Sequence, residues 1–160
     1  MDIDPALEEN LETLQATILD KKLSAPQVVQ LCNEAGYLVL GLGGRRFAIP
    51  FEGMVAKLAF KPQGLADNHL EWLFYKAASP EVSRLLAPTY RHSPQGINWQ
   101  GRCRPILVED LDNAHILTRQ LVQAGIGDVV INLGLYEDKV VCYDYALLRA
   151  ETANKLLHPF

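Results

Sequence analysis

Three short apolar runs, separated by glycine-bearing connections, constrain the fold more than any other stretch of the chain. They cover residues 37–40, 45–50 and 54–60, with Gly41-Leu42-Gly43-Gly44 after the first run and Glu52-Gly53 after the second. Short apolar runs joined by glycine-containing turns are typical of antiparallel strands connected in sequence order. The chain is therefore expected to contain a three-stranded meander, and an all-helical fold is excluded.

Helices are expected on both sides of this meander. Asp4 and Ser24 are positioned to cap two N-terminal helices, with Pro5 at the first position of one helix and Gly36 at the end of the other. The expected helices span residues 5–19, 25–35, 67–78 (from Asp67 or Asn68, after a break at residues 62–64), 80–86, 114–124 and 147–157.

Four further strands follow the meander. Two are expected at residues 97–103 and 106–109, and a hairpin is expected from residues 129–135 and 139–145 across Tyr136-Glu137-Asp138. The resulting order is helices, three strands, helices, two strands, helix, hairpin, helix, which is an α+β layout.

Length and charge narrow the class of protein. The chain has 160 residues, 49% of them hydrophobic, and a net charge of −4. This length predicts one globular unit, with residues 1–36 as a helical pair packed on a body formed by residues 37–160. The acidic balance argues against a nucleic-acid partner. Since there is neither an apolar run of about 18 residues nor a signal peptide, we expect a cytoplasmic protein without a membrane partner.

Two features of the meander point to chemistry, and each has a second interpretation. Lys57 interrupts an apolar run, and strand alternation places it on one face with Val55 and Ala59. That face would line a cleft, or Lys57 would be an edge-strand lysine that discourages aggregation. The glycines at 41–44 would bring the backbone close to an anion, or would form a tight hairpin turn with positive φ.

These features together resemble the small lobe of the protein kinase and aminoglycoside phosphotransferase superfamily. The element order from residue 37 matches that lobe, Val55-Ala56-Lys57 resembles its lysine strand, and Glu71 lies fourteen residues further on in the next helix. Asp144-Tyr145-Ala146 follows an apolar strand, as the superfamily's metal-binding motif does. The chain is also similar to the small kinase-like proteins that bacteriophage genomes encode. The implied fold is a five-stranded antiparallel sheet plus helix, with a strongly reduced helical C-lobe and two added N-terminal helices.

The resemblance implies a role for each matching residue. Gly41, Gly43 and Gly44 would cover the phosphates of ATP, Lys57 would bind them, and Glu71 would hold Lys57. Glu109 would mark the hinge whose backbone meets the adenine ring. The remaining implied roles are Mg²⁺ binding for Asn132 and Asp144 and a catalytic base for Asp128. Taken alone, Glu71 could instead be a solvated helix carboxylate, Asn132 a hairpin residue and Asp144 a turn former.

Several departures weaken the catalytic part of this pattern. Arg46 occupies the place of the third glycine, and five arginines, at 45, 46, 91, 102 and 104, could form a phosphate- or protein-binding patch or a solvated strand face. Asp128 precedes Asn132 by four positions where the superfamily has five, and no His-Arg or His-Gly precedes Asp128. Only 22 residues separate Glu109 from Asn132 and 16 follow Asp144, which predicts no platform for an acceptor substrate.

Three functions remain open on these grounds. The first is a degenerate kinase-like protein, or pseudokinase, that binds a protein partner or regulates one and retains nucleotide binding. The second is a minimal ATP- and Mg²⁺-dependent phosphotransferase. The third is an unrelated α+β protein-interaction domain, since a shared fold does not establish a shared function.

Overall fold

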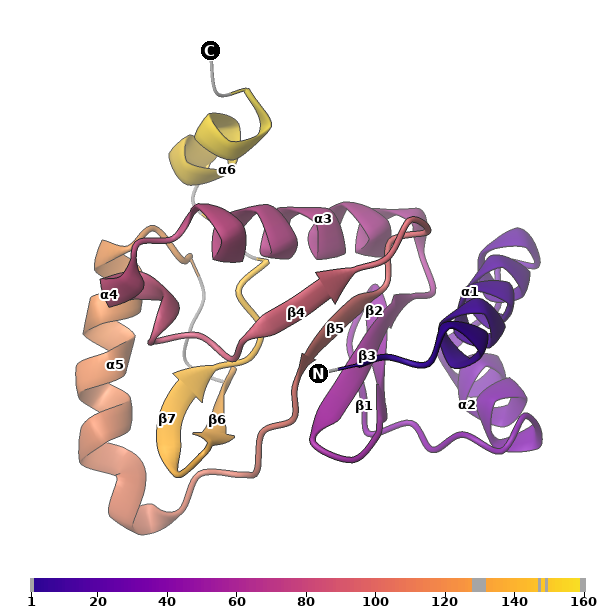
Figure 1. Ribbon diagram of the computed structural model, residues 1–160, viewed down its shortest axis with the longest axis horizontal. Coiled ribbons are helices and arrows are strands. Elements are labelled where there is room, and N and C mark those ends of the chain that lie inside the picture. Colours follow the sequence, from indigo (N-terminus) through magenta and orange to yellow (C-terminus); the bar gives the residue numbers. More distant parts are fainter. Residues whose placement is uncertain (1, 128–131, 147, 149, 159–160) are drawn as a thin grey trace. The chain divides into compact units, whose positions relative to one another are not determined.

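The computed structural model describes residues 2–127, 132–146, 148 and 150–158 (Figure 1). The chain divides into two compact units, one formed by residues 1–69 and 90–100 and the other by residues 70–89 and 101–160. The class is α+β, with a five-stranded antiparallel sheet and six α-helices in the described part of the chain. The first unit holds the N-terminal helices and most of the sheet.

The two N-terminal helices form as their capping residues predict. Helix α1 (Pro5–Asp20) begins after Asp4, whose side chain accepts a hydrogen bond from the Ala6 N–H at 3.0 Å. Helix α2 (Ala25–Glu34) begins after Ser24, whose N–H donates to the Gln27 side chain at 2.9 Å. Gly36, at a φ of +86°, ends this segment in the left-handed region that glycine adopts without strain.

The sheet of the first unit comprises β1 (Gly41–Leu42), β2 (Arg46–Pro50), β3 (Met54–Ala59), β4 (Thr89–His92) and β5 (Asn98–Gly101), in the order β1-β2-β3-β5-β4. One face of this sheet and the helices α1 and α2 share a hydrophobic core. Its sheet residues include Phe47, Ile49, Ala56, Leu58 and Trp99. Figure 1 shows α1 and α2 beside β1–β3. The N-terminal helices therefore cover the sheet face opposite to Lys57.

The first strand lies later in the chain than the apolar run predicts. Residues 37–40 are outside β1, which is formed by Gly41 and Leu42 paired with Ala48 and Phe47. The Leu40 N–H also donates to the Ala48 carbonyl at 2.8 Å, so Leu40 and Gly41 both lie opposite Ala48. This two-to-one pairing is a β-bulge, which an apolar run does not reveal.

Helix α3 (Pro62–Ala77) starts at the point where the sequence predicts a break. Pro62 is at its first position, where a missing N–H costs nothing. Gly64 fits because the helix lies close to the sheet: a Cβ there would be 2.4 Å from the Arg45 carbonyl oxygen. Close packing, rather than a turn, explains this glycine.

The strand expected at residues 106–109 is absent, and β4 lies instead at Thr89–His92. Residues Val108–Asp110 form a 3₁₀ helix, η1, in which the Asp110 carboxylate accepts from the Leu107 N–H at 2.9 Å. Val108 is 85% exposed, so this apolar run is not a buried strand. Local side-chain capping has overridden strand propensity.

The second unit has its own core around Leu117, Leu121, Ile126, Cys142 and Tyr145. Its elements, besides the later part of α3 and the 3₁₀ helix η1, are α4 (Pro80–Ser83), α5 (Leu111–Gln123), β6 (Leu133–Tyr136), β7 (Lys139–Cys142) and α6 (Ala150–Leu157). Figure 1 shows α5 alongside the β6–β7 hairpin. The hairpin confirms the expected turn, because Glu137 and Asp138 both have positive φ. Residues 129–131 of the expected hairpin lie outside the described residues.

Candidate functional site

Lys57 lies in β3 on the sheet face that the N-terminal helices do not cover. Strand pairing places Ala48 opposite Lys57, Arg46 opposite Ala59 and Pro50 opposite Val55. Residues opposite each other in an antiparallel pair point to the same face. We call this surface the Lys57 face; it consists of Arg46, Ala48, Pro50, Val55, Lys57 and Ala59. Lys57 is only 7% exposed, which excludes the interpretation of a solvated edge lysine.

Two small residues continue the row that begins at Lys57. Ala48 lies opposite Lys57, and Gly41 lies opposite Ala48. A Cβ built on Gly41 would have no atom of the protein within 4 Å. The row across β3, β2 and β1 therefore consists of Lys57, Ala48 and Gly41, with open space at Gly41.

The glycine turn is a hairpin, but neither backbone strain nor packing requires its glycines. The Gly43 N–H donates to the Arg46 carbonyl at 2.9 Å, which closes a tight turn. The glycines with positive φ are Gly36, Gly53, Gly96 and Gly125, so the expectation of positive φ in this turn is wrong. A Cβ on Gly43 would lie 3.7 Å from its nearest atom, and one on Gly44 would have none within 4 Å. All three glycines leave space next to their backbone.

Asn68 of α3 ties the helix to the Lys57 face. Its side-chain N–H groups donate to the Lys57 carbonyl at 2.9 Å and to the Gly96 carbonyl at 2.8 Å. Its side-chain oxygen accepts from Arg46 at 3.0 Å, and its backbone carbonyl accepts from Asn98 at 2.9 Å. Asn68 and Asn98 are completely buried. Because every one of these groups is hydrogen-bonded, the start of α3 is held rigidly on β3.

Glu71 is buried in the second unit and holds the residue after Asp144. It is 0% exposed, and its Oε2 accepts a hydrogen bond from the Tyr145 N–H at 3.2 Å. Tyr145 is also 0% exposed; its hydroxyl donates to the Ala87 carbonyl at 3.0 Å and is hydrogen-bonded to the Thr89 hydroxyl. The interpretation of Glu71 as a solvated carboxylate is therefore wrong. The structure brings Glu71 next to the motif that contains Asp144.

Asn132 and Asp144 lie at the open end of the β6–β7 hairpin, one on each side. Leu133 pairs with Cys142 at the open end, and the Tyr143 N–H donates to the Asn132 carbonyl at 2.9 Å. Asp144 follows directly and is half-buried, as is Asn132. Burial, together with the negative charge of Asp144, raises the pKa of the Tyr143 hydroxyl. Two oxygen-bearing side chains thus belong to neighbouring positions on one hairpin.

Two predicted site residues are not part of these arrangements. Glu109 is exposed in the 3₁₀ helix η1 rather than at the end of a strand, so its expected hinge position is wrong. Strand β5 ends at Gly101, and the chain leaves the sheet there. Asp128 lies outside the described residues, and its role stays a prediction.

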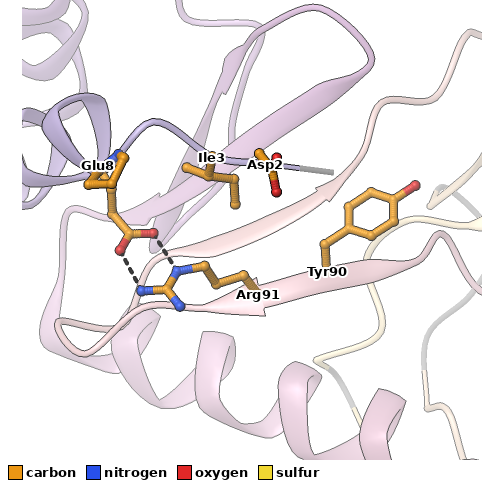
Figure 2. Close-up of a pocket in the computed structure, with 6 residues that line it drawn as sticks. Asp2, Ile3, Glu8, Tyr90 and Arg91 are labelled. Carbon is orange, nitrogen blue, oxygen red and sulfur yellow. Dashed lines mark hydrogen bonds and ion pairs between the residues drawn. The ribbon is translucent and has the colours of Figure 1, made fainter.

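A separate cavity of about 500 Å³ lies in the first unit between the start of α1 and β4 (Figure 2). Arg91 donates two hydrogen bonds of 2.8 Å to the two carboxylate oxygens of Glu8, and the Trp99 indole N–H donates a third at 2.9 Å. The hydrogen bonds from Arg91 hold the pKa of Glu8 below its usual value, against the opposing effect of burial. Figure 2 shows the Arg91 side chain directed at Glu8, whereas Tyr90 points away from the pair. This pair fastens α1 to the sheet.

Sequence reasoning missed Asn68 and the position of Arg46 on the Lys57 face. An asparagine inside a helix carries no motif, and only its burial and its hydrogen bonds reveal it. Arg46 was noted as a departure from the glycine pattern, yet its position on the Lys57 face depends on strand register. The available signal was the alternation of β2, in which Phe47 and Ile49 are large and apolar, whereas Arg46 is charged and Ala48 is small.

The described ranges (residues 2–127, 132–146, 148 and 150–158) contain no group of three or more His, Cys, Asp or Glu side chains that could hold a metal ion. No helix within the described part of the chain is long and apolar enough to cross a bilayer. Comparisons with protein-family models, with curated proteins and with solved structures gave no match. The case for a function therefore rests on the residues and their geometry.

Proposed function

We propose that the chain is a degenerate kinase-like module that binds a nucleoside triphosphate and acts by binding rather than by phosphoryl transfer. The glycines of the β1–β2 turn and Lys57 take the phosphates, and Glu71, in the second unit, holds the motif that contains Asp144. These roles follow from the resemblance to the protein kinase superfamily. A protein partner would bind the nucleotide-bound state of the chain in preference to the nucleotide-free state.

The observation that carries the proposal is the hydrogen bond between Glu71 and the Tyr145 N–H at 3.2 Å. The resemblance assigns Glu71 and Asp144 to one nucleotide site, although 73 positions separate them in the chain. A completely buried carboxylate bonded to the residue next to Asp144 supports that assignment. The space beside Gly41, Gly43 and Gly44 supports it independently, because a ligand explains glycines that the protein's own packing does not require.

The donor set fits a hard divalent cation. Mg²⁺ prefers oxygen ligands and is held by one or two protein groups together with substrate phosphates. Asn132 offers an amide oxygen and Asp144 a carboxylate at the open end of the hairpin, where the Tyr143 N–H donates to the Asn132 carbonyl. Bound there with the nucleotide, Mg²⁺ would neutralise phosphate charge.

Departures inside the motifs favour binding over catalysis. The four-residue spacing of Asp128 and Asn132 would move the aspartate to another side of its loop relative to the superfamily pattern. A general base must lie within hydrogen-bond reach of the acceptor hydroxyl. Between β5 and the hairpin, the described residues form the 3₁₀ helix η1 and the helix α5 (Leu111–Gln123).

Thermal unfolding with ATP and MgCl₂ tests the proposal. A ligand at 100 times its dissociation constant adds about 2.7 kcal/mol of stability, so millimolar ATP should raise the melting temperature clearly. Lys57→Met, which keeps the apolar stem, should abolish the shift. Lys61→Met, at an exposed lysine just after β3, is the matched control and should retain it. An unchanged melting temperature of the wild-type chain would sink the proposal and leave the unrelated interaction domain.

A phosphotransfer assay distinguishes the degenerate binding module from the second candidate function, a minimal phosphotransferase. The degenerate module should release no phosphate and label no acceptor while binding ATP. Turnover that disappears in Asp144→Asn, together with retained ATP binding, would instead establish the minimal phosphotransferase.

A further inference from the structure

We propose that the start of α5 carries a docking surface for a basic segment of a partner protein, in which large apolar side chains are flanked by lysine or arginine. We call this surface the η1 patch; it consists of Leu107, Val108 and Leu111. The assignment rests on the proposed function in one respect, because it gives the partner-binding role a place and a chemistry. The patch belongs to the second unit alone, and partner binding there requires no nucleotide.

Three large apolar side chains of the η1 patch are exposed. Val108 is 85% exposed, Leu107 is 52% exposed and Leu111 is 45% exposed. Residues three or four apart in a helical segment are neighbours on its surface, so Leu111 lies beside both of the others. Single exposed apolar residues are normal on a protein surface, whereas a contiguous apolar group points to an interaction site.

The backbone beneath these side chains is held by local hydrogen bonds. The Asp110 carboxylate accepts from the Leu107 N–H at 2.9 Å, and the Asp110 N–H donates to the Leu107 carbonyl at 2.9 Å. Helix α5 begins directly afterwards and is anchored through the buried residues Leu117 and Leu121. The exposed side chains therefore stand on a turn that is already ordered, which lowers the entropic cost of binding a partner.

The charges around the η1 patch are all negative. Between Arg104 and Arg119 the chain has three acidic residues and neither lysine nor arginine. Glu109 directly follows Val108 and Asp112 directly follows Leu111, and both acidic residues are exposed. Arg104 forms an ion pair with Asp138, so its charge is offset elsewhere. The apolar group thus has an acidic rim.

This rim selects the occupant of the patch. A two-fold contact between two copies of the chain would place Glu109 and Asp112 of both copies against one another, and such like charges are unfavourable. An anionic lipid surface is repelled for the same reason. A peptide with apolar side chains between lysines or arginines satisfies both parts of the surface, because its cations meet the two carboxylates while its apolar groups cover the patch.

The first unit provides a matched control for apolar exposure without charge. Leu38 is 72% exposed and Leu40 is 51% exposed, close to the values for Val108 and Leu107. Residues 37–44 include no charged side chain. A partner that required only exposed leucines would bind both places, whereas a basic apolar segment should prefer the η1 patch.

Fluorescence anisotropy of a labelled synthetic peptide with the full chain, in the absence of nucleotide, tests this inference. The probe is an amphipathic helix of about 15 residues made of leucine and lysine. The double variant Leu107→Asn with Val108→Asn should weaken probe binding by about tenfold or more, because the apolar contact is lost. Leu38→Asn with Leu40→Asn should change it less than about threefold. All four positions are exposed, so both variants should remain folded.

A second pair of variants tests the acidic rim. Glu109→Gln with Asp112→Asn should weaken binding of the lysine probe several-fold and reduce its salt dependence. Glu9→Gln with Asp20→Asn, at exposed acidic residues of the first unit, makes the same change in net charge and should leave binding nearly unaltered. A probe with glutamate in place of every lysine should not bind the wild-type chain.

The outcomes separate this inference from the proposed function. Absence of probe binding, binding of the glutamate probe, or equal losses in the two leucine-containing double variants would overturn the docking surface. A wild-type dimer in sedimentation that Leu107→Asn with Val108→Asn dissociates would assign the patch to a second copy and overturn it as well. ATP with Mg²⁺ that raises the melting temperature without any probe binding would overturn the surface while nucleotide binding stands. Probe binding at the patch without any effect of ATP would support the surface and overturn the nucleotide assignment.

Discussion

Single residues stabilise this protein where a charged group is buried with all its partners. Glu8 is only 7% exposed, yet three hydrogen bonds from Arg91 and Trp99 compensate its carboxylate. Charge-assisted and bidentate hydrogen bonds are the stronger kind, and losing one partner leaves the other costly to bury. The Glu8–Arg91 pair should therefore contribute to stability at neutral pH and lose its effect in acid.

We expect Arg91→Met to lower the free energy of unfolding by about 1–2 kcal/mol at pH 7. The lower part of the usual range applies because the Arg91 side chain is 48% exposed and screened by solvent. Urea denaturation measures the loss, with Arg119→Met on the exposed face of α5 as the control.

The pH dependence has a definite sign. The pKa of Glu8 is lowered by folding, so its stabilisation is complete well above about pH 4.5 and fades as the pH falls through the folded-state pKa. Burial raises the pKa of Glu12, which works in the opposite direction. The difference between wild type and Arg91→Met should therefore shrink in acid. A difference that is constant from pH 7 to pH 3 would contradict this assignment.

At the scale of elements, the start of α3 is determined by close contact with the sheet. Gly64 lies where a Cβ would meet the Arg45 carbonyl oxygen at 2.4 Å and the Ala59 Cβ at 2.9 Å. Asn68, one turn later, donates to β3 at Lys57. The position of the helix on the sheet therefore depends on the absence of a side chain at Gly64 as well as on the hydrogen bond from Asn68 to the Lys57 carbonyl.

Gly64→Ala should destabilise the chain even though alanine favours helices by about 1 kcal/mol over glycine. The added methyl group meets backbone that cannot move aside, and overpacking costs about 1–3 kcal/mol. Gly44→Ala is the control, because a Cβ there meets nothing within 4 Å and the φ is not in the left-handed region. Guanidinium denaturation should show a clear loss for the first variant and a change below about 0.5 kcal/mol for the second. A stabilised Gly64→Ala chain would disprove the close packing.

At the scale of the whole molecule, the chain builds two hydrophobic cores rather than one. Leu11 belongs to the core of the first unit and Leu121 to that of the second, and both are 0% exposed. Stability need not be uniform across such a structure, because each core holds its own elements.

Shortening a buried side chain in one core should therefore lower local stability mainly in the unit that contains that core. Leu11→Ala and Leu121→Ala should each cost about 2–5 kcal/mol, as buried leucines do. Hydrogen exchange should show the larger loss of amide protection in α1 and β2–β3 for the first variant, and in α5 and β6–β7 for the second. The same exchange pattern in both variants would show that the two cores unfold together.

Much of the fold was predictable because it depends on local chemistry. The caps at Asp4 and Ser24, the strand around Lys57 and the hairpin turn at Glu137-Asp138 all use short-range preferences, and the structure confirms them. One error falls at residues 106–109, where side-chain capping by Asp110 gives a 3₁₀ helix in place of a strand. Another falls at β1, where a bulge shifts the pairing to Gly41 and Leu42.

The candidate site divides in the same way. The residues Lys57, Glu71 and Asp144 could be named from motif and spacing, as could the glycines of the turn. The Glu71–Tyr145 hydrogen bond and the Asn68 network join positions up to 74 residues apart, so no local pattern contains them. Glu109 failed as a hinge residue because its strand did not form.

The sequence by itself determined the class of fold, the order of helices and strands and the residue types of the proposed site, because these depend on periodicity, capping and side-chain chemistry. Only the tertiary structure decided which residues share a surface. Strand register placed Arg46 on the same sheet face as Lys57. The packing of the second unit buried Glu71 and placed it within hydrogen-bond distance of the Tyr145 amide. The reason is physical: register and burial come from the packing of distant segments, and a shift of one residue would send Arg46 to the opposite face.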